Sequence, residues 1–115
     1  MPRDPGKYLY DMDDAATFLL DFTARQSIDR FRSDRPFRSA VERELLIIGE
    51  ALFQLERHHP TIAERISEYQ RIIRFRHVLV HGYDQIDADL VWVVVSEKLT
   101  VLRDEVRTLL SESST

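Results

Sequence analysis

The chain has 115 residues, of which 43% are apolar and 31% charged, and its formal net charge is −4 at pH 7. This length suffices for one core, so we predict a single domain over residues 1–115. The absence of cysteine excludes disulfides, thiolate nucleophiles and cysteine-ligated zinc. The net negative charge argues against a protein that coats nucleic acid, since phosphate binding depends on many cations.

Apolar periodicity predicts that the first helix follows Asp4 and Pro5, which form a cap and first-turn pair. Its apolar residues recur at alternating steps of four and three: Tyr8, Met12, Ala15, Leu19 and Phe22. The segment 27–35 breaks this pattern, so we predict a loop or a short turn there.

The second helix is predicted to run from about Pro36 to about His58, where Pro60 stops it. Gly49 lies inside this helix, where glycine costs about 1 kcal/mol relative to alanine. We therefore predict that a neighbouring helix approaches closely at Gly49. A short helical turn is expected over residues 61–66.

The third helix is predicted from Tyr69 to about Val80 and is apolar on nearly every side, so we expect it to be the most buried. Gly82 ends it, and Asp87 caps a fourth helix that runs to about Leu110. Residues 90–95 are β-branched enough for a strand, but no partner strand is visible, and we predict helix.

Short connections between these segments indicate an all-α protein, an antiparallel four-helix bundle with an additional short helix. The predicted core is Val41, Leu45, Ile48, Leu52, Leu55, Ile72, Phe75, Leu79, Leu99 and Leu102. The first residues lack the apolar segment of a signal peptide, and the longest apolar run has six residues, far short of a membrane span. We expect a cytoplasmic protein that does not enter membranes.

Arg76, His77, His81 and Tyr83 lie within eight residues of one predicted helix and its end. Arg76 interrupts a stripe that should be buried, and a buried charge normally has a partner or a task. Alternatively, Arg76 extends to the rim of the core and the histidines cap the helix end. Imidazole can act as acid or base near neutral pH, and arginine offers forked donors to phosphate oxygens. Together these groups suit RNA cleavage without a metal.

The spacing of this pair raises a geometric question. Five residues place Arg76 and His81 about 140° apart on an ideal helix, whereas Arg74, His77 and His81 share a face better. Either the helix unwinds before Gly82, or the groups converge across two subunits, and the spacing leaves both open. His77 and His81 also have the spacing of two metal ligands, but there is no HExxH pattern, and the only nearby candidates for a third ligand are Asp84, Asp87 and Asp89. We expect neither a metal nor a cofactor.

The segment Arg76 to Tyr83 resembles the R-x4-H-x-Y motif of HepT-like toxins in the HEPN superfamily. His77 takes the polar position after the arginine, where many of these proteins have asparagine. Upstream, the run around Gly49-Glu50-Ala51 resembles the second-helix pattern of the family. Downstream, residues 84–92 resemble its run of a tyrosine, an acidic turn and then Val-Trp. The resemblance covers nearly the whole chain.

The resemblance implies an all-helical homodimer whose two motif copies form one metal-independent endoribonuclease site. It implies that the protein is the toxin of a toxin–antitoxin pair with a nucleotidyltransferase antitoxin. Arg76 and His81 are then the catalytic pair, His77 a supporting polar residue, and Tyr83 the candidate site of AMP addition. Arg71, Arg74 and some of the five arginines within residues 25–38 are expected to hold RNA phosphates.

Two other functions are compatible with the same fold. The chain would be a non-catalytic helical subunit that presents substrate to a separate nucleotidyltransferase, or a structural dimer in which the motif has become an interface salt bridge. Growth arrest on expression that His81→Ala abolishes would single out the nuclease.

Overall fold

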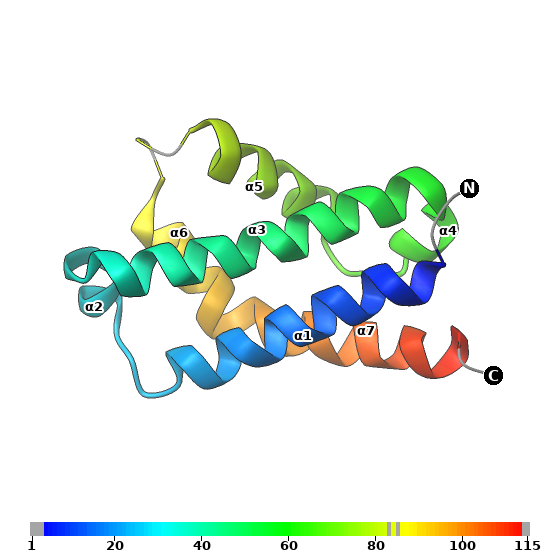
Figure 1. The fold of residues 1–115 in the computed structure, drawn as a ribbon, viewed down its shortest axis with the longest axis horizontal. Coiled ribbons are helices and arrows are strands. Elements are labelled where there is room, and N and C mark those ends of the chain that lie inside the picture. Colours follow the sequence, from blue (N-terminus) through cyan, green and yellow to red (C-terminus); the bar gives the residue numbers. More distant parts are fainter. Residues whose placement is uncertain (1–3, 83, 85, 114–115) are drawn as a thin grey trace.

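A computed structural model describes residues 4–82, 84 and 86–113 of the chain (Figure 1). The elements in order are α1 (Pro5–Thr23), α2 (Ile28–Ser33), α3 (Arg35–His58), α4 (Pro60–Ala63), α5 (Tyr69–His81), α6 (Ala88–Val93), the π-helical turn η2 (Val94–Lys98) and α7 (Leu99–Ser113). No strand occurs among these residues, which confirms the predicted all-α class. The β-branched run 90–95 is helical, as predicted.

Aspartates cap two helices at the starts that the sequence predicted for them. Asp4 accepts a hydrogen bond from the Gly6 N–H at 2.7 Å at the start of α1. Asp87 accepts from the N–H groups of Asp89 and Leu90 at the start of α6. Such caps satisfy amide groups that have no partner within the helix. The predicted boundaries of the long helices are confirmed to within three residues.

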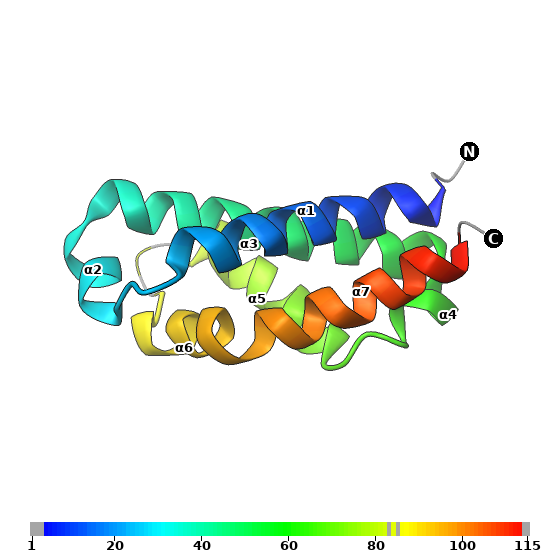
Figure 2. The same ribbon diagram turned by 90° about the horizontal axis from the view of Figure 1, so that it is seen from below.

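The core lies between α1, α3 and the continuous helix formed by α6, η2 and α7 (Figure 2). Seven of the ten predicted core residues are buried: Val41, Leu45, Ile48, Leu52, Leu55, Leu99 and Leu102. The other three, Ile72, Phe75 and Leu79, are only partly buried against the core. All three belong to α5.

The prediction that the third helix is the most buried one is wrong, because α5 has no buried residue. It packs chiefly against α3 and leaves its other side uncovered, with Val78 and Val80 each 42% exposed. Helix α5 carries apolar side chains on nearly every face, and a single neighbouring helix cannot bury all of them. The sequence pattern therefore indicates how apolar α5 is but not how deeply it is buried. In the single chain, part of the apolar surface of α5 stays in contact with solvent.

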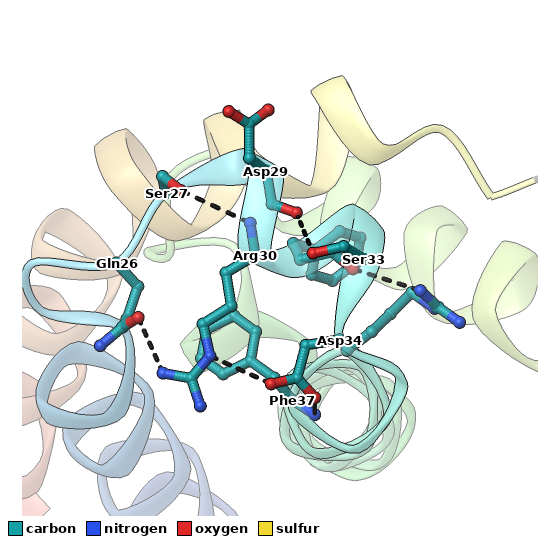
Figure 3. Close-up of polar contacts among 9 residues, drawn as sticks. Gln26, Ser27, Asp29, Arg30, Ser33, Asp34 and Phe37 are labelled. Atoms are coloured by element: carbon teal, nitrogen blue, oxygen red, sulfur yellow. Dashed lines mark hydrogen bonds and ion pairs between the residues drawn. The ribbon is translucent and has the colours of Figure 1, made fainter.

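The prediction of a loop or short turn over residues 27–35 is wrong in part, because residues 28–33 form the helix α2. The Ser27 hydroxyl accepts from the Arg30 N–H, and Arg30 reaches both Gln26 at 2.8 Å and Asp34 at 3.3 Å (Figure 3). Phe31 is 1% exposed and anchors the helix to the core. One buried side chain in six residues is too sparse to produce a periodic signal.

Asp34 caps α3, and the hydrogen bond that it accepts from the Phe37 N–H holds the pKa of its carboxyl below the ordinary value of 3.8 (Figure 3). A lowered folded pKa stabilises the folded state above pH 3.8, and this contribution is lost as the pH falls through the folded value. We predict that Asp34→Asn, which keeps a good capping residue, lowers the unfolding temperature at pH 7 but has a smaller effect at pH 3. Thermal melts at both pH values test this, with Asp104→Asn, a substitution of an exposed aspartate of α7, as control. An equal loss at both pH values would contradict it.

Candidate active site

Helix α5 carries the motif and remains helical through His81. The Gly82 N–H donates to the Val78 carbonyl at 2.8 Å, which ends the helix at the predicted residue. The φ of Gly82 is −116°, so this position does not require the left-handed conformation that favours glycine. The helix does not unwind before Gly82. Arg76 and His81 of one chain therefore stay on different faces of α5.

Arg76 lies where α5 crosses α3 at Gly49. A Cβ atom added to Gly49 would lie 2.5 Å from the Cβ of Arg76, closer than two such atoms come in real proteins. The absence of a side chain at Gly49 therefore lets the two helices approach. The predicted close approach of a neighbouring helix at Gly49 is confirmed, and the neighbour is the motif residue itself.

The Arg76 guanidinium has partners on both sides along α3. Its Nε donates to Glu50 Oε2 at 2.5 Å, and its Cζ lies 4.6 Å from the centre of the Phe53 ring. The Arg76 side chain is 23% exposed and that of Glu50 is 47% exposed. A charge-assisted hydrogen bond and a cation–π contact together fix the guanidinium and offset its partial desolvation.

Glu50 and Phe53 were not predicted from the sequence as partners of Arg76. A signal for them was present, because Gly49 predicted a helix crossing, Phe53 lies four positions after Gly49, and Glu50 lies three positions before Phe53 on a neighbouring part of the helix surface. Gln54 donates to the other Glu50 oxygen at 3.4 Å, so both carboxylate oxygens are engaged. The charge predicted to need a partner or a task has a partner.

His77 and His81 lie on the exposed side of α5, one helical turn apart. Their ring centroids are 4.5 Å apart and their planes are tilted by 49°. Arg74 is exposed on the same side and forms no ion pair within the described part of the chain. This face presents two imidazoles and a guanidinium to solvent, groups that can move protons and bind a phosphate.

Two further predicted site residues contribute less to this face. Arg71 is highly exposed and forms an ion pair with Glu68 at 3.0 Å. Tyr83, the candidate site of AMP addition, lies outside the described residues. Among the residues that the structure describes, no three histidines, aspartates or glutamates are grouped in a way that could hold a metal ion.

An open groove of about 310 Å³ lies between α1, α3 and α5. Val80, Leu46, Ile47 and Ala51 form its apolar part, and Glu50 lies at its edge. Exposed Val80 in the groove and exposed Val78 on the histidine side make the C-terminal half of α5 apolar on both flanks. Surfaces of this kind commonly mark contacts with another protein chain.

Comparison with known proteins identifies related sequences over most of the chain. The sequence profile of the family described as "Ribonuclease HepT-like" matches residues 12–109. A protein of Methanocaldococcus jannaschii whose name describes it as a candidate RNase is 30% identical over 104 residues, which cover 90% of this chain and 94% of that one. A protein of Thermococcus cleftensis named as a probable ribonuclease HepT is 31% identical over 107 residues, covering 90% and 93% of the two chains. No solved structure matches this chain.

None of the helices among the described residues is long and apolar enough to cross a membrane.

Proposed function

Because this chain belongs to the HepT-like ribonuclease family, we propose that it is a metal-independent endoribonuclease whose site is assembled from two copies of the chain. The observation that carries this proposal is the position of the motif on α5. Arg76 faces α3 while His81 faces solvent, and α5 stays helical between them. A second copy related by a two-fold axis would supply the missing groups to each exposed face.

The proposed dimer uses the part of α5 that one chain leaves uncovered. Val78 and Val80, each 42% exposed, would be buried against the partner copy, together with the apolar part of the groove that Val80 lines. Burial of about 80 Å² of apolar surface contributes about 2 kcal/mol, so a few such side chains offset much of the cost of association. In this arrangement the four long helical segments of each copy form the antiparallel bundle that the sequence predicts.

The chemistry requires a base, an acid and a fixed cation. One His81 takes the proton from the 2′-hydroxyl as its oxygen attacks the phosphorus, and the His81 of the partner copy gives a proton to the leaving 5′-oxygen. The products are a 2′,3′-cyclic phosphate and a free 5′-hydroxyl, and the protons balance. Arg76 stabilises the charge that develops on the phosphoryl oxygens, with Glu50 holding its guanidinium in place. His77 supports the adjacent imidazole.

Purified protein incubated with total RNA in EDTA tests this proposal directly. We expect cleavage to persist in EDTA and to stop in His81→Ala, and light scattering at micromolar concentration to give the mass of a dimer. Cleavage that requires a divalent cation would contradict metal independence, and a protein that is only monomeric would contradict the two-copy site.

The Arg76–Glu50 ion pair favours a second candidate function, in which the chain is a non-catalytic helical subunit of a two-component nucleotidyltransferase. A guanidinium already held by a carboxylate is also what a purely structural motif would contain. Expression in cells separates the candidates. A toxin arrests growth and its His81→Ala variant does not, whereas a non-catalytic subunit leaves growth unchanged in both cases.

Arg71 and Arg74, on the exposed side of α5 with His77 and His81, are proposed to hold RNA phosphates beside the site. We predict that the double variant Arg71→Glu/Arg74→Glu binds RNA more weakly and with a smaller salt dependence, by about 0.7 in the log–log slope for each phosphate that is no longer neutralised. Binding titrations at several salt concentrations measure both quantities. Unchanged affinity and slope would mean that these side chains are only solvated.

We further propose that the protein is the toxin of a pair in which a nucleotidyltransferase antitoxin adds AMP to Tyr83. The modification would place a bulky, negatively charged phosphodiester two residues from His81, in the space that the RNA phosphate needs. We predict that Tyr83→Phe retains most nuclease activity but resists neutralisation by the antitoxin. Mass spectrometry after co-expression provides the check, and a Tyr83→Phe variant that is still modified and silenced would contradict it.

A further inference from the structure

A second open groove, of about 430 Å³, lies at the end of the molecule where the motif helix ends. It is lined by Arg32, Arg35, Arg38 and Glu42 from α2 and α3, and by Asp84 and Ile86 from the segment after α5. Figure 1 shows α2, the start of α3, the end of α5 and the start of α6 at this same end. The volume is within the range of pockets that hold small ligands, about 300–1,000 Å³. We call it the arginine groove.

Two arginines of the groove differ in how they are held: Arg38 donates to carbonyls in the last turn of α2, whereas the Arg35 side chain has no such contact within the described residues. Arg38 Nη1 donates to the Phe31 and Arg32 carbonyls at 3.3 and 3.0 Å, which fixes its guanidinium while leaving its other donors without a partner among the described residues. Arg35 forms no ion pair or hydrogen bond through its side chain within the same part of the chain and is the first residue of α3. A cation in the first turn of a helix opposes the helix dipole and is unfavourable by itself.

The remaining side chains of the groove are of mixed character. Arg32 is already paired with Asp89 at 2.7 Å, so Arg35 and Arg38 supply the available cations. Glu42 and Asp84 add two carboxylates, acceptors for hydroxyl or amino groups, and Ile86 and Ala88, both partly buried, give an apolar surface. A bare phosphate would use only the arginines. A nucleotide would use all three kinds of group: its phosphate on arginine, its ribose hydroxyl or base amino group on a carboxylate, and its base on the apolar part.

The distance between the arginine groove and the candidate active site would allow one RNA strand to occupy both. Asp84 follows His81 by three residues, so their Cα atoms are at most about 11 Å apart. Along α3, Arg38 precedes Gly49, where Arg76 crosses, by eleven residues, or about 16 Å at 1.5 Å per residue. A few nucleotides of single-stranded RNA span lengths of this size.

We propose that the arginine groove binds one nucleotide of a single-stranded RNA substrate a few residues away from the bond that is cut. Arg35 and Arg38 contact its phosphate, and Glu42 or Asp84 accepts from its ribose or base. This inference rests on the proposed nuclease function and adds a subsite to it. The groove increases the affinity for longer RNA and takes no part in the chemical step.

Anisotropy titrations with a fluorescein-labelled 12-nucleotide single-stranded RNA test the proposal, with every protein in the His81→Ala background so that the RNA stays intact. We expect Arg35→Glu, which removes no side-chain hydrogen bond or ion pair within the described chain, to raise the Kd about ten-fold or more and to reduce the log–log salt slope by about 0.7. Arg35→Lys keeps the charge and should recover most of the slope. Arg57→Glu, exposed at the other end of α3, is the matched control and should change neither quantity.

The outcomes separate this proposal from the nuclease proposal. If the wild-type chain cleaves RNA in EDTA but Arg35→Glu binds the 12-nucleotide RNA normally, the groove is not a subsite although the nuclease stands. If Arg35→Glu weakens binding while the wild-type chain cleaves nothing, the groove stands and the nuclease proposal fails. If the groove takes a free nucleotide instead, millimolar AMP, GMP, CMP or UMP binds in an Arg35-dependent way while RNA affinity is unchanged, which overturns the proposal. RNA that does not bind to the chain at all overturns both.

Discussion

Replacing His81 by alanine is expected to lower the rate of RNA cleavage by a factor of about 10²–10⁴, the usual contribution of a general acid or base. The same variant should also inactivate wild-type chains with which it forms dimers, because the proposed cleft needs an imidazole from each of two copies. With a four-fold excess of His81→Ala and free exchange of subunits, only about one wild-type chain in five pairs with another in a symmetric dimer. The activity per wild-type chain should then fall to about one fifth, which a cleavage assay on exchanged mixtures measures.

His58→Ala is the matched control for this experiment, because His58 is exposed at the far end of α3 and its ring stacks on Tyr8. An excess of that variant should leave the activity per wild-type chain unchanged. A result in which His81→Ala also leaves this activity unchanged would mean that one copy's imidazole suffices, and the two-copy cleft would be abandoned. Full activity of His81→Ala by itself would exclude His81 as the acid or base.

Replacing Gly49 by alanine should destabilise the protein, although alanine is normally favoured over glycine inside a helix by about 1 kcal/mol. The new Cβ would lie 2.5 Å from the Arg76 Cβ, an atom that cannot move unless α5 moves. Overpacking of this kind costs about 1–3 kcal/mol. Each kcal/mol lowers the melting temperature of a small domain by about 4–8 °C. Thermal melts followed by circular dichroism measure the difference.

A double variant identifies the cause of this destabilisation. In Arg76→Gly, the atom that the new methyl group meets is absent, so Gly49→Ala should cost less in that background than in the wild-type chain. We also expect Gly49→Ala to impair cleavage beyond its effect on stability, since moving α5 displaces Arg76 from Glu50 and Phe53. A rise in melting temperature for the single variant would show that the helices separate at no cost.

Periodicity and local chemistry were sufficient to place the long helices. The repeats in α1 and α3, and the caps at Asp4 and Asp87, act over a few residues, so their signals are complete within one segment of the sequence. The short helix α2 was not predicted, because it is held by the buried Phe31 and a few side-chain hydrogen bonds, and neither produces a periodic pattern in the sequence. The family motif from Arg76 to Tyr83 is likewise a property of contiguous residues.

The all-α class, the ends of the long helices, the close approach at Gly49 and membership of the HepT-like family could all be predicted from the sequence. Tertiary packing was needed to show that the approaching group is Arg76, that Glu50 and Phe53 hold it, and that α5 is half-covered instead of central. Packing also brings Arg35 and Arg38 to the same end of the molecule as Asp84, which follows the motif. Helix formation depends on neighbours within about four residues, whereas the Arg76–Glu50 contact joins residues that are 26 positions apart and depends on how the helices pack.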